Sequence, residues 1–240
     1  ESLVQTYIPK VMTTHFTHPF DIHQFFEQPL PMAMAGLENA LVDLYYKSKD
    51  ENTIAALFPE PLTDTLSRGA VLGDVPFEQL PRKIDELVAQ GVERIKLKIK
   101  PADGFERVQY AVKHYPHLQW VVDANRSYTL ENIEALTKLD QFGLVCIEEP
   151  FATDNLEDYK NILPQLSTPL CFDENVQSWS DLQALSQLKG KTMLNIKIGR
   201  LGGLYQTKEA IAFCRKNNIS FWTGSMVESG ISKILHTQLA

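Results

Sequence analysis

The sequence of 240 residues has few cysteines and no histidine-based metal motif. Its three cysteines, Cys146, Cys171 and Cys214, cannot form a disulfide framework. None of them belongs to a CxxC pattern, and the six histidines form no HExxH motif. We therefore exclude a disulfide-stabilised domain and a thiolate zinc site, and we expect reduced cysteines in a protein of the cytoplasm.

The sequence also lacks an excess of basic residues and a long apolar run. Its 23 Lys and Arg residues against 30 Asp and Glu residues give a formal net charge of −7. No basic surface is therefore predicted that would bind nucleic acid or an anionic membrane. No apolar stretch reaches the roughly 18–20 residues that a membrane span requires. The expected partner is a small molecule, and a homo-oligomer is left open.

From about residue 63 onward, short apolar runs alternate with amphipathic segments, which is typical of α/β proteins. The predicted strands are Ser67–Leu72, Arg94–Lys100, Gln119–Asp123, Leu144–Glu148, Leu170–Asp173, Met193–Lys197 and Ser220–Thr223. The predicted helices are Phe77–Gln90, Gly104–His114, Leu130–Leu139, Leu156–Leu166, Ser178–Leu188, Gly203–Asn217 and Ile231–Ala240. Residues 1–62 show no strand alternation; they contain a predicted helix, Met34–Lys47, and are assigned to a separate helical domain.

Five charged residues follow one another at nearly equal spacing, each late in a predicted strand. They are Lys98, Asp123, Glu148, Asp173 and Lys197, at intervals of 25, 25, 25 and 24 residues. One strand, one helix and two short loops fill such an interval. Because alternate strand residues face opposite sides, the apolar neighbours of these five place them all toward a barrel axis. Barrel enzymes carry their chemistry at the carboxyl ends of the strands, so we expect the five side chains to meet there.

Three carboxylates between two lysines indicate a metal site flanked by two candidate bases. Buried carboxylates are costly unless they are paired or bind a metal. A set of oxygen ligands without His or Cys suits Mg²⁺ or Mn²⁺. Such a site favours removal of the proton next to a substrate carboxylate, with Lys98 and Lys197 on the two faces of the substrate. The alternative is a structural salt-bridge cluster in which the two lysines only neutralise carboxylates.

Six motifs of the chain resemble the enolase superfamily in its muconate-lactonizing subgroup. They are KLKIKP (96–101), VDANRSYT (122–129), IEEPF (147–151), FDEN (172–175), NIKIGRLGG (195–203) and GSMVESG (224–230). In addition, AGLENALVDL (35–44) resembles the helix of that family's capping domain. Within the subgroup the motifs look most like those of o-succinylbenzoate synthases and N-acylamino acid racemases.

The resemblance implies an α/β fold of the (β/α)7β type, a modified TIM barrel. Residues 63–240 would form the barrel, and residues 1–62 would be the helical part of an α+β capping domain. The 178 residues of the barrel portion are fewer than the roughly 250 of a full barrel. No eighth strand is found, so we expect sequence to be missing at both ends, including the capping domain's specificity loop.

The resemblance also implies roles for individual residues. Asp123, Glu148 and Asp173 would bind Mg²⁺, or Mn²⁺ in its place. Lys98 would be the general base, while Lys197 would stabilise the enediolate or act as the opposite acid/base. Four further residues would lie near the substrate or beside the ligands: Lys96, Asn125, Ser225 and Met226. The implied reaction is dehydration of 2-succinyl-6-hydroxy-2,4-cyclohexadiene-1-carboxylate to o-succinylbenzoate in menaquinone biosynthesis, with racemisation of N-succinylamino acids as the alternative.

Two remoter interpretations stay open. A lysine on the sixth strand of a barrel is also where class I aldolases form a Schiff base, although such enzymes do not use three carboxylates. A barrel without catalytic activity, acting as a subunit or scaffold, is the other. A glycosidase pair is excluded because Glu148 and Glu149 face opposite sides of their strand. The GRLGG stretch (199–203) lacks a phosphate-binding pattern, so we predict a tight strand-to-helix turn there.

Overall fold

The structure is a computed structural model that describes residues 3–26, 30–58, 60, 63 and 65–240. The chain divides into two compact units: residues 65–194 form one, and residues 1–64 with 195–240 form the other. The predicted domain boundary, between residues 62 and 63, touches a residue outside the described ones and stays a prediction. Within the described segments, we find no helix that combines the length and the apolar character of a membrane span.

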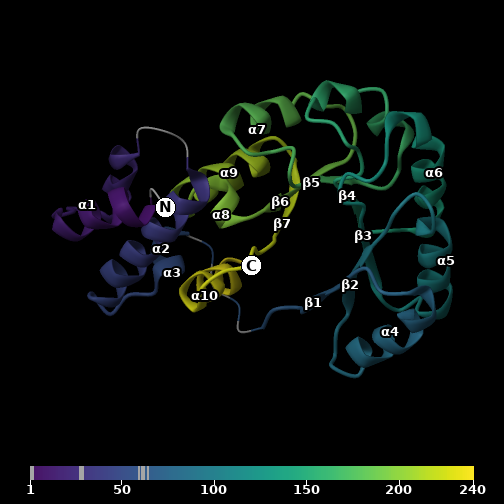
Figure 1. The fold of residues 1–240 in the computed structure, drawn as a ribbon, viewed down its shortest axis with the longest axis horizontal. Helices are drawn as coiled ribbons and strands as arrows, with labels where there is room; N and C mark the ends of the chain where they lie inside the picture. The colour runs from purple at the N-terminus through teal and green to yellow at the C-terminus, as the bar shows by residue number, and fades with distance from the viewer. Residues whose placement is uncertain (1–2, 27–29, 59, 61–62, 64) are drawn as a thin grey trace. The chain divides into compact units, whose positions relative to one another are not determined.

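Residues 65–194 contain a parallel sheet with helices between its strands (Figure 1). The strands are β1 (Gly69–Leu72), β2 (Arg94–Lys98), β3 (Gln119–Asp123), β4 (Cys146–Glu148), β5 (Leu170–Phe172) and the first part of β6 (Thr192–Ile196). Each pairs in parallel with the next in sequence, and β7 (Ser220–Thr223) follows β6 in the strand order. All seven predicted strands are found, and the predicted α/β class is confirmed. Parallel neighbours in sequence order require a helix-type crossover after each strand.

The helical segments of this unit lie between its strands in the sequence. They are η3 (Phe77–Gln79), α4 (Leu80–Val88), α5 (Gly104–His114), η4 (Leu130–Asn132), α6 (Ile133–Thr137), η5 (Lys138–Phe142), η6 (Leu156–Tyr159), η7 (Leu163–Gln165) and α7 (Trp179–Leu185). Helix α5 has the bounds that its periodicity predicts. Helix α7 begins after Ser178, whose side chain accepts the backbone N–H of Asp181. That contact satisfies one of the amides that a helix start leaves without a partner.

The predicted helix over Leu156–Leu166 is wrong. The structure has two short 3₁₀ helices there, η6 and η7, instead of one α-helix. Pro164 lies inside the segment, and a proline in a helix interior lacks its N–H donor and clashes with the carbonyl four residues earlier. The apolar side chains of the segment, such as Tyr159 and Leu163, are nevertheless buried. The segment thus buries its apolar side chains although it does not form one regular helix.

The second unit is mainly helical. Its elements are η1 (Leu3–Tyr7, a π-helix), α1 (Ile8–Thr13), η2 (Pro19–Phe25), α2 (Pro31–Lys47), α3 (Thr53–Leu57), the end of β6, α8 (Ile198–Leu201), α9 (Leu204–Lys216), β7 and α10 (Gly230–Leu239). Helix α2 begins three residues before the predicted Met34, because Pro31 is well suited to a first helical position. The GRLGG stretch forms the predicted turn, in which Gly202 and Gly203 have φ of 97° and 131°.

Candidate active site

Lys98, Asp123 and Glu148 end three neighbouring strands at one level of the sheet. Lys98 of β2 pairs with Asp123 of β3, and Asp123 pairs with Glu148 of β4. On β5, however, the residue paired with Glu148 is Cys171, so Asp173 follows two positions further along the chain. The equally spaced residues therefore do not all lie at one level. The first three do, and Asp173 on the next strand is displaced by two positions. A stagger between strands is what closing a parallel sheet requires.

The alternation that predicts an inward face for the charged residues is present in β2. Ile95 and Leu97 are fully buried, whereas Lys96 and Lys98 are half-buried. Asp123 and Glu148 are 3% and 1% exposed. Carboxylates buried to this extent need compensation by hydrogen bonds or positive charge.

Lys96 provides that compensation. Its Nζ lies 2.8 Å from Asp123 Oδ2 and 2.7 Å from Glu148 Oε1. Burial lowers the pKa of Lys96, but the charges of Glu148 and Asp123 outweigh burial and raise this pKa above its ordinary value. Lys96 is thus a firmly protonated cation between two carboxylates. The salt-bridge interpretation assigned this role to Lys98 and Lys197; for these two carboxylates the structure gives it to Lys96.

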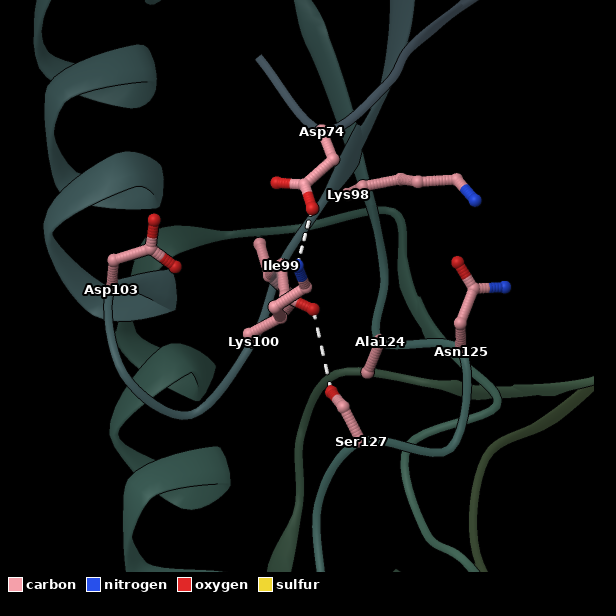
Figure 2. Close-up of a pocket in the computed structure, with 8 residues that line it drawn as sticks. All are labelled: Asp74, Lys98, Ile99, Lys100, Asp103, Ala124, Asn125 and Ser127. Carbon is pink, nitrogen blue, oxygen red and sulfur yellow. Dashed lines mark hydrogen bonds and ion pairs between the residues drawn. The ribbon is translucent and has the colours of Figure 1, made fainter. Parts of the chain in front are cut away.

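Lys98 lines a pocket at the ends of β2 and β3. The lining residues are Asp74, Lys98, Ile99, Lys100, Asp103, Ala124, Asn125 and Ser127. Figure 2 shows that the Lys98 and Asn125 side chains extend to the same side, whereas Asp103 lies on the opposite side. Lys100 forms an ion pair with Asp74 across the pocket. Over the described residues, the Lys98 amine has no ion pair or hydrogen bond, so it is the lysine of this strand that remains available to a ligand.

Asp173, just after β5, is 3% exposed and is held by a residue that sequence reasoning left without a role. Its backbone N–H donates to Glu149 Oε2 at 2.7 Å. Glu149 itself is fully buried with a φ of 40°. Burial is the main cause that raises the pKa of Glu149 to about 7. The hydrogen bond from the Asp173 backbone N–H lowers this pKa, and the nearby charge of Glu174 raises it further. No signal in the sequence distinguishes this Glu from an outward surface residue.

Asn125 and the loop residues of β7 are placed as follows. Asn125 is exposed, has a φ of 43°, and donates its backbone N–H to Asp123 Oδ1 at 3.0 Å. In the other unit, Ser225 is exposed and accepts a hydrogen bond from Lys233 Nζ at 2.7 Å. Met226 is half-buried, and its N–H donates to Glu228. Asn125 thus orients a predicted ligand, while substrate contacts by Ser225 and Met226 stay predictions.

Lys197 belongs to the unit of residues 1–64 and 195–240. It directly follows β6 and precedes the short helix α8, and its side chain is half-buried. This place, at the carboxyl end of a parallel strand, is the one predicted. Its role as the second acid/base stays a prediction.

The chemistry of the predicted ligands fits a hard divalent cation, because all three candidates are carboxylates. The carboxylates of Asp123 and Glu148 both contact one positive charge, the Lys96 ammonium. Their oxygens therefore already face a common position that a cation occupies. In the part of the chain that the structure describes, no three His, Cys, Asp or Glu side chains gather closely enough to hold a metal ion. Two of the three predicted ligands, Asp123 and Glu148, therefore lie together, and metal binding by all three stays a prediction.

Comparison with known proteins places the chain in a family. Residues 79–240 match the family described as Enolase C-terminal domain-like. An o-succinylbenzoate synthase of Enterococcus faecalis is 35% identical over 241 residues, which cover 98% of this chain and 65% of that protein. An N-succinylamino acid racemase of Thermus thermophilus is 30% identical, with 99% of this chain and 65% of that protein covered.

The solved structures agree with the sequence matches. A structure from Enterococcus faecalis, described as an unknown member of the enolase superfamily, is 34% identical with a TM-score of 0.88, and the match covers 100% of this chain and 65% of the other. The chain thus spans about 65% of the length of these relatives. The resemblance found in the motifs is confirmed. The chain belongs to the enolase superfamily.

Proposed function

We propose that this protein is a Mg²⁺-dependent o-succinylbenzoate synthase, a carbon–oxygen lyase of menaquinone biosynthesis. The proposed reaction removes water from 2-succinyl-6-hydroxy-2,4-cyclohexadiene-1-carboxylate. Relatives of this name, such as the synthases of Enterococcus faecalis and Bacillus subtilis at 35% and 32% identity, support it. One observation carries the proposal. Asp123 and Glu148 contact the same cation, Lys96, and they lie at the same level of the sheet as Lys98, whose amine has no ion pair among the described residues.

The proposed chemistry begins at the carbon next to the substrate carboxylate. The Nζ of Lys98, in its neutral form, takes the proton from C1, and the electron pair left there becomes an enediolate. This electron pair then forms the C1–C6 double bond as the C6–O bond breaks. The Lys98 ammonium returns the proton to the departing hydroxyl group, so that water leaves and the lysine is restored. The ring becomes aromatic, which makes the step favourable.

The other charged residues of the site are proposed to stabilise the charges that develop during this reaction. Asp123, Glu148 and Asp173 are proposed to hold the Mg²⁺, which when bound offsets the charge that develops on the substrate carboxylate. The Lys96 ammonium contacts both of the first two carboxylates and orients them. The Lys197 ammonium is proposed to stabilise the enediolate. Asn125, Ser225 and Met226 are proposed to contact the substrate or the loop around it.

Racemisation of N-succinylamino acids is the second candidate. The racemase of Thermus thermophilus, at 30% identity over 99% of this chain, favours it. The same residues suffice: Lys98 and Lys197 would remove and return the α-proton on opposite faces. A Schiff-base aldolase would instead be trapped on Lys197 by borohydride in the presence of substrate and would tolerate a chelator, which distinguishes it from both.

Both activities are tested with the cyclohexadiene acid and with N-succinyl amino acids, each with Mg²⁺ and with EDTA. Replacement Lys98→Ala is expected to lower the rate by about 10²–10⁴-fold, the usual contribution of a general base. The matched control is Lys83→Ala, because Lys83 is a lysine of helix α4 that pairs with Glu86 and is not among the residues that line this pocket. An unchanged rate in a folded Lys98→Ala variant would refute the assignment of the base.

The organisation of the chain is also proposed on this basis. Residues 63–240 would form the barrel domain and residues 1–62 a part of the capping domain, in keeping with a family match that begins at residue 79. A small carboxylate is the proposed partner. The three cysteines are unpaired and buried, which suits the predicted cytoplasmic location.

A further inference from the structure

Helix α2 carries a fully buried carboxylate, Glu38, in the unit of residues 1–64 and 195–240. Its Oε1 accepts the backbone N–H of Leu204 and, at 3.3 Å, that of Tyr205. Its Oε2 contacts Nε2 of His23. Both oxygens of this carboxylate are therefore used. Since an unpaired buried carboxylate is very costly, this set of contacts is what allows a Glu at this position.

The contacts of Glu38 satisfy the start of helix α9. The first amides of a helix have no acceptor within the helix. A side chain of the preceding residue usually caps them, but that residue here is Gly203, which has none. Glu38 supplies the acceptor from a segment 166 residues away in sequence. A negative charge at this end of a 13-residue helix is also favoured by the helix dipole.

Gly202 and Gly203 make this approach of α2 feasible. A Cβ atom on Gly203 would lie 2.5 Å from Cδ of Glu38, and one on Gly202 would lie 2.7 Å from Cε of Met34. Both residues also have a positive φ, which L side chains rarely adopt. The glycine pair of the GRLGG turn is thus explained by contact with α2.

The turn that Glu38 anchors begins at Lys197. The carbonyl of Lys197 accepts the N–H groups of Arg200 and Leu201 at 2.9 and 3.0 Å. The next carbonyl, of Ile198, accepts those of Gly202 and Gly203 at 3.2 and 2.9 Å. The backbone from Lys197 to Leu204 is therefore one continuous hydrogen-bonded turn. Strand β6 holds its first end, and Glu38 holds its last.

We propose that Glu38 is a positioning residue for Lys197. By fixing the start of α9, it fixes the turn that carries the Lys197 backbone, and through it the place of the Lys197 amine. This inference rests on the proposed function in so far as Lys197 acts on substrate. It assigns to the capping-domain helix a part in the geometry of the second acid/base.

The test uses Glu38→Ala, the milder Glu38→Gln, and Asp43→Asn as a matched control. Asp43 is a carboxylate of the same helix whose ion pair, with Lys47, is local. Reductive methylation with ¹³C-formaldehyde labels the lysine amines for NMR, and Lys197→Arg identifies the Lys197 signal. We expect this signal to shift in Glu38→Ala, to shift less in Glu38→Gln, which keeps an acceptor oxygen, and to stay in Asp43→Asn. In hydrogen exchange, the Leu204 and Tyr205 amides should exchange faster in the Glu38 variants alone.

A second measurement follows exchange of the α-proton in D₂O for N-succinyl-L- and N-succinyl-D-phenylalanine. Because each lysine serves one enantiomer, Glu38→Ala should slow exchange of one enantiomer by about 10–100-fold, the effect of a misplaced catalytic group. Exchange of the other should change less than about twofold.

The outcomes separate the two hypotheses. If the wild type exchanges neither enantiomer, the racemase candidate fails, the synthase is decided by its own assay with the cyclohexadiene acid, and the NMR signal of Lys197 still decides the positioning role. If the Leu204 and Tyr205 amides are loosened while the Lys197 signal is unchanged, or if both enantiomers slow equally, Glu38 is a structural cap only and the inference is wrong. If Glu38→Ala does not fold, the same comparison is made with Glu38→Gln.

Discussion

Removal of the Lys96 amine is expected to destabilise the sheet, because it leaves two buried carboxylates without their shared cation. The side chains of Asp123 and Glu148 are 4% and 1% exposed, and that of Lys96 is 20% exposed. Removing one partner of a buried ion pair typically costs about 3–5 kcal/mol. We therefore expect Lys96→Met, which keeps the aliphatic part of the side chain, to lose about 3 kcal/mol or more of unfolding free energy at pH 7 without added metal.

The measurement is urea denaturation in EDTA, followed by tryptophan fluorescence, for which Trp120 in β3 is a buried reporter. The control is Lys100→Met, since the pair of Lys100 with Asp74 is exposed to solvent and should contribute little to stability. A loss of about 3 kcal/mol would also lower the melting temperature by roughly 6–12 °C for a domain of this size.

The pH dependence of this difference follows from the pKa of Lys96. The pKa of Lys96 is higher in the folded protein than in the unfolded chain. The contribution of Lys96 to the unfolding free energy is therefore fully present below the pKa of the unfolded chain, and it is lost only as pH rises through the pKa of the folded protein. The difference in unfolding free energy between wild type and Lys96→Met should accordingly be constant from pH 6 to 9. If Lys96→Met falls within about 1 kcal/mol of Lys100→Met, the conclusion that Lys96 compensates the two carboxylates is refuted.

Three further predictions concern other parts of the chain. Because burial raises the pKa of Glu149 to about 7, the contribution of Glu149 to stability in EDTA should fall by about 2–4 kcal/mol as pH rises from 4.5 to 7, and the difference in unfolding free energy between wild type and Glu149→Gln should change with pH by this amount. Gly104→Ala should cost about 1–3 kcal/mol in a denaturation assay, because its Cβ would lie 2.8 Å from the Tyr128 hydroxyl; Gly36→Ala, with no atom nearby, should not destabilise. Finally, Mg²⁺ should raise the melting temperature of the wild type but not of Glu148→Gln, and an equal rise in both would contradict the ligand assignment.

The site was predictable in part because strand parity is a local property. Apolar residues such as Ile95 and Leu97 alternate with Lys96 and Lys98, and this pattern sets the inward face without any knowledge of the fold. The level of each residue in the sheet is not local. It depends on the register between strands, which pairs Glu148 with Cys171 and puts Asp173 two positions further along.

The partners of the buried charges were also beyond sequence reasoning. Which lysine neutralises Asp123 and Glu148 depends on the reach of side chains across three strands, and the structure selects Lys96. Glu149 belongs to the same class, since only the fold brings it to the Asp173 amide.

By itself, the sequence determined the order and type of the strands, the ends of β3 and β7, and the helix Gly104–His114, because periodicity and caps act over a few neighbouring residues. Only the tertiary structure decided that Glu38 caps a helix 166 residues away and that the two glycines before this helix make room for it. Such contacts arise when distant segments pack, and the free energy of burying a charge is settled by whatever lies next to it in space.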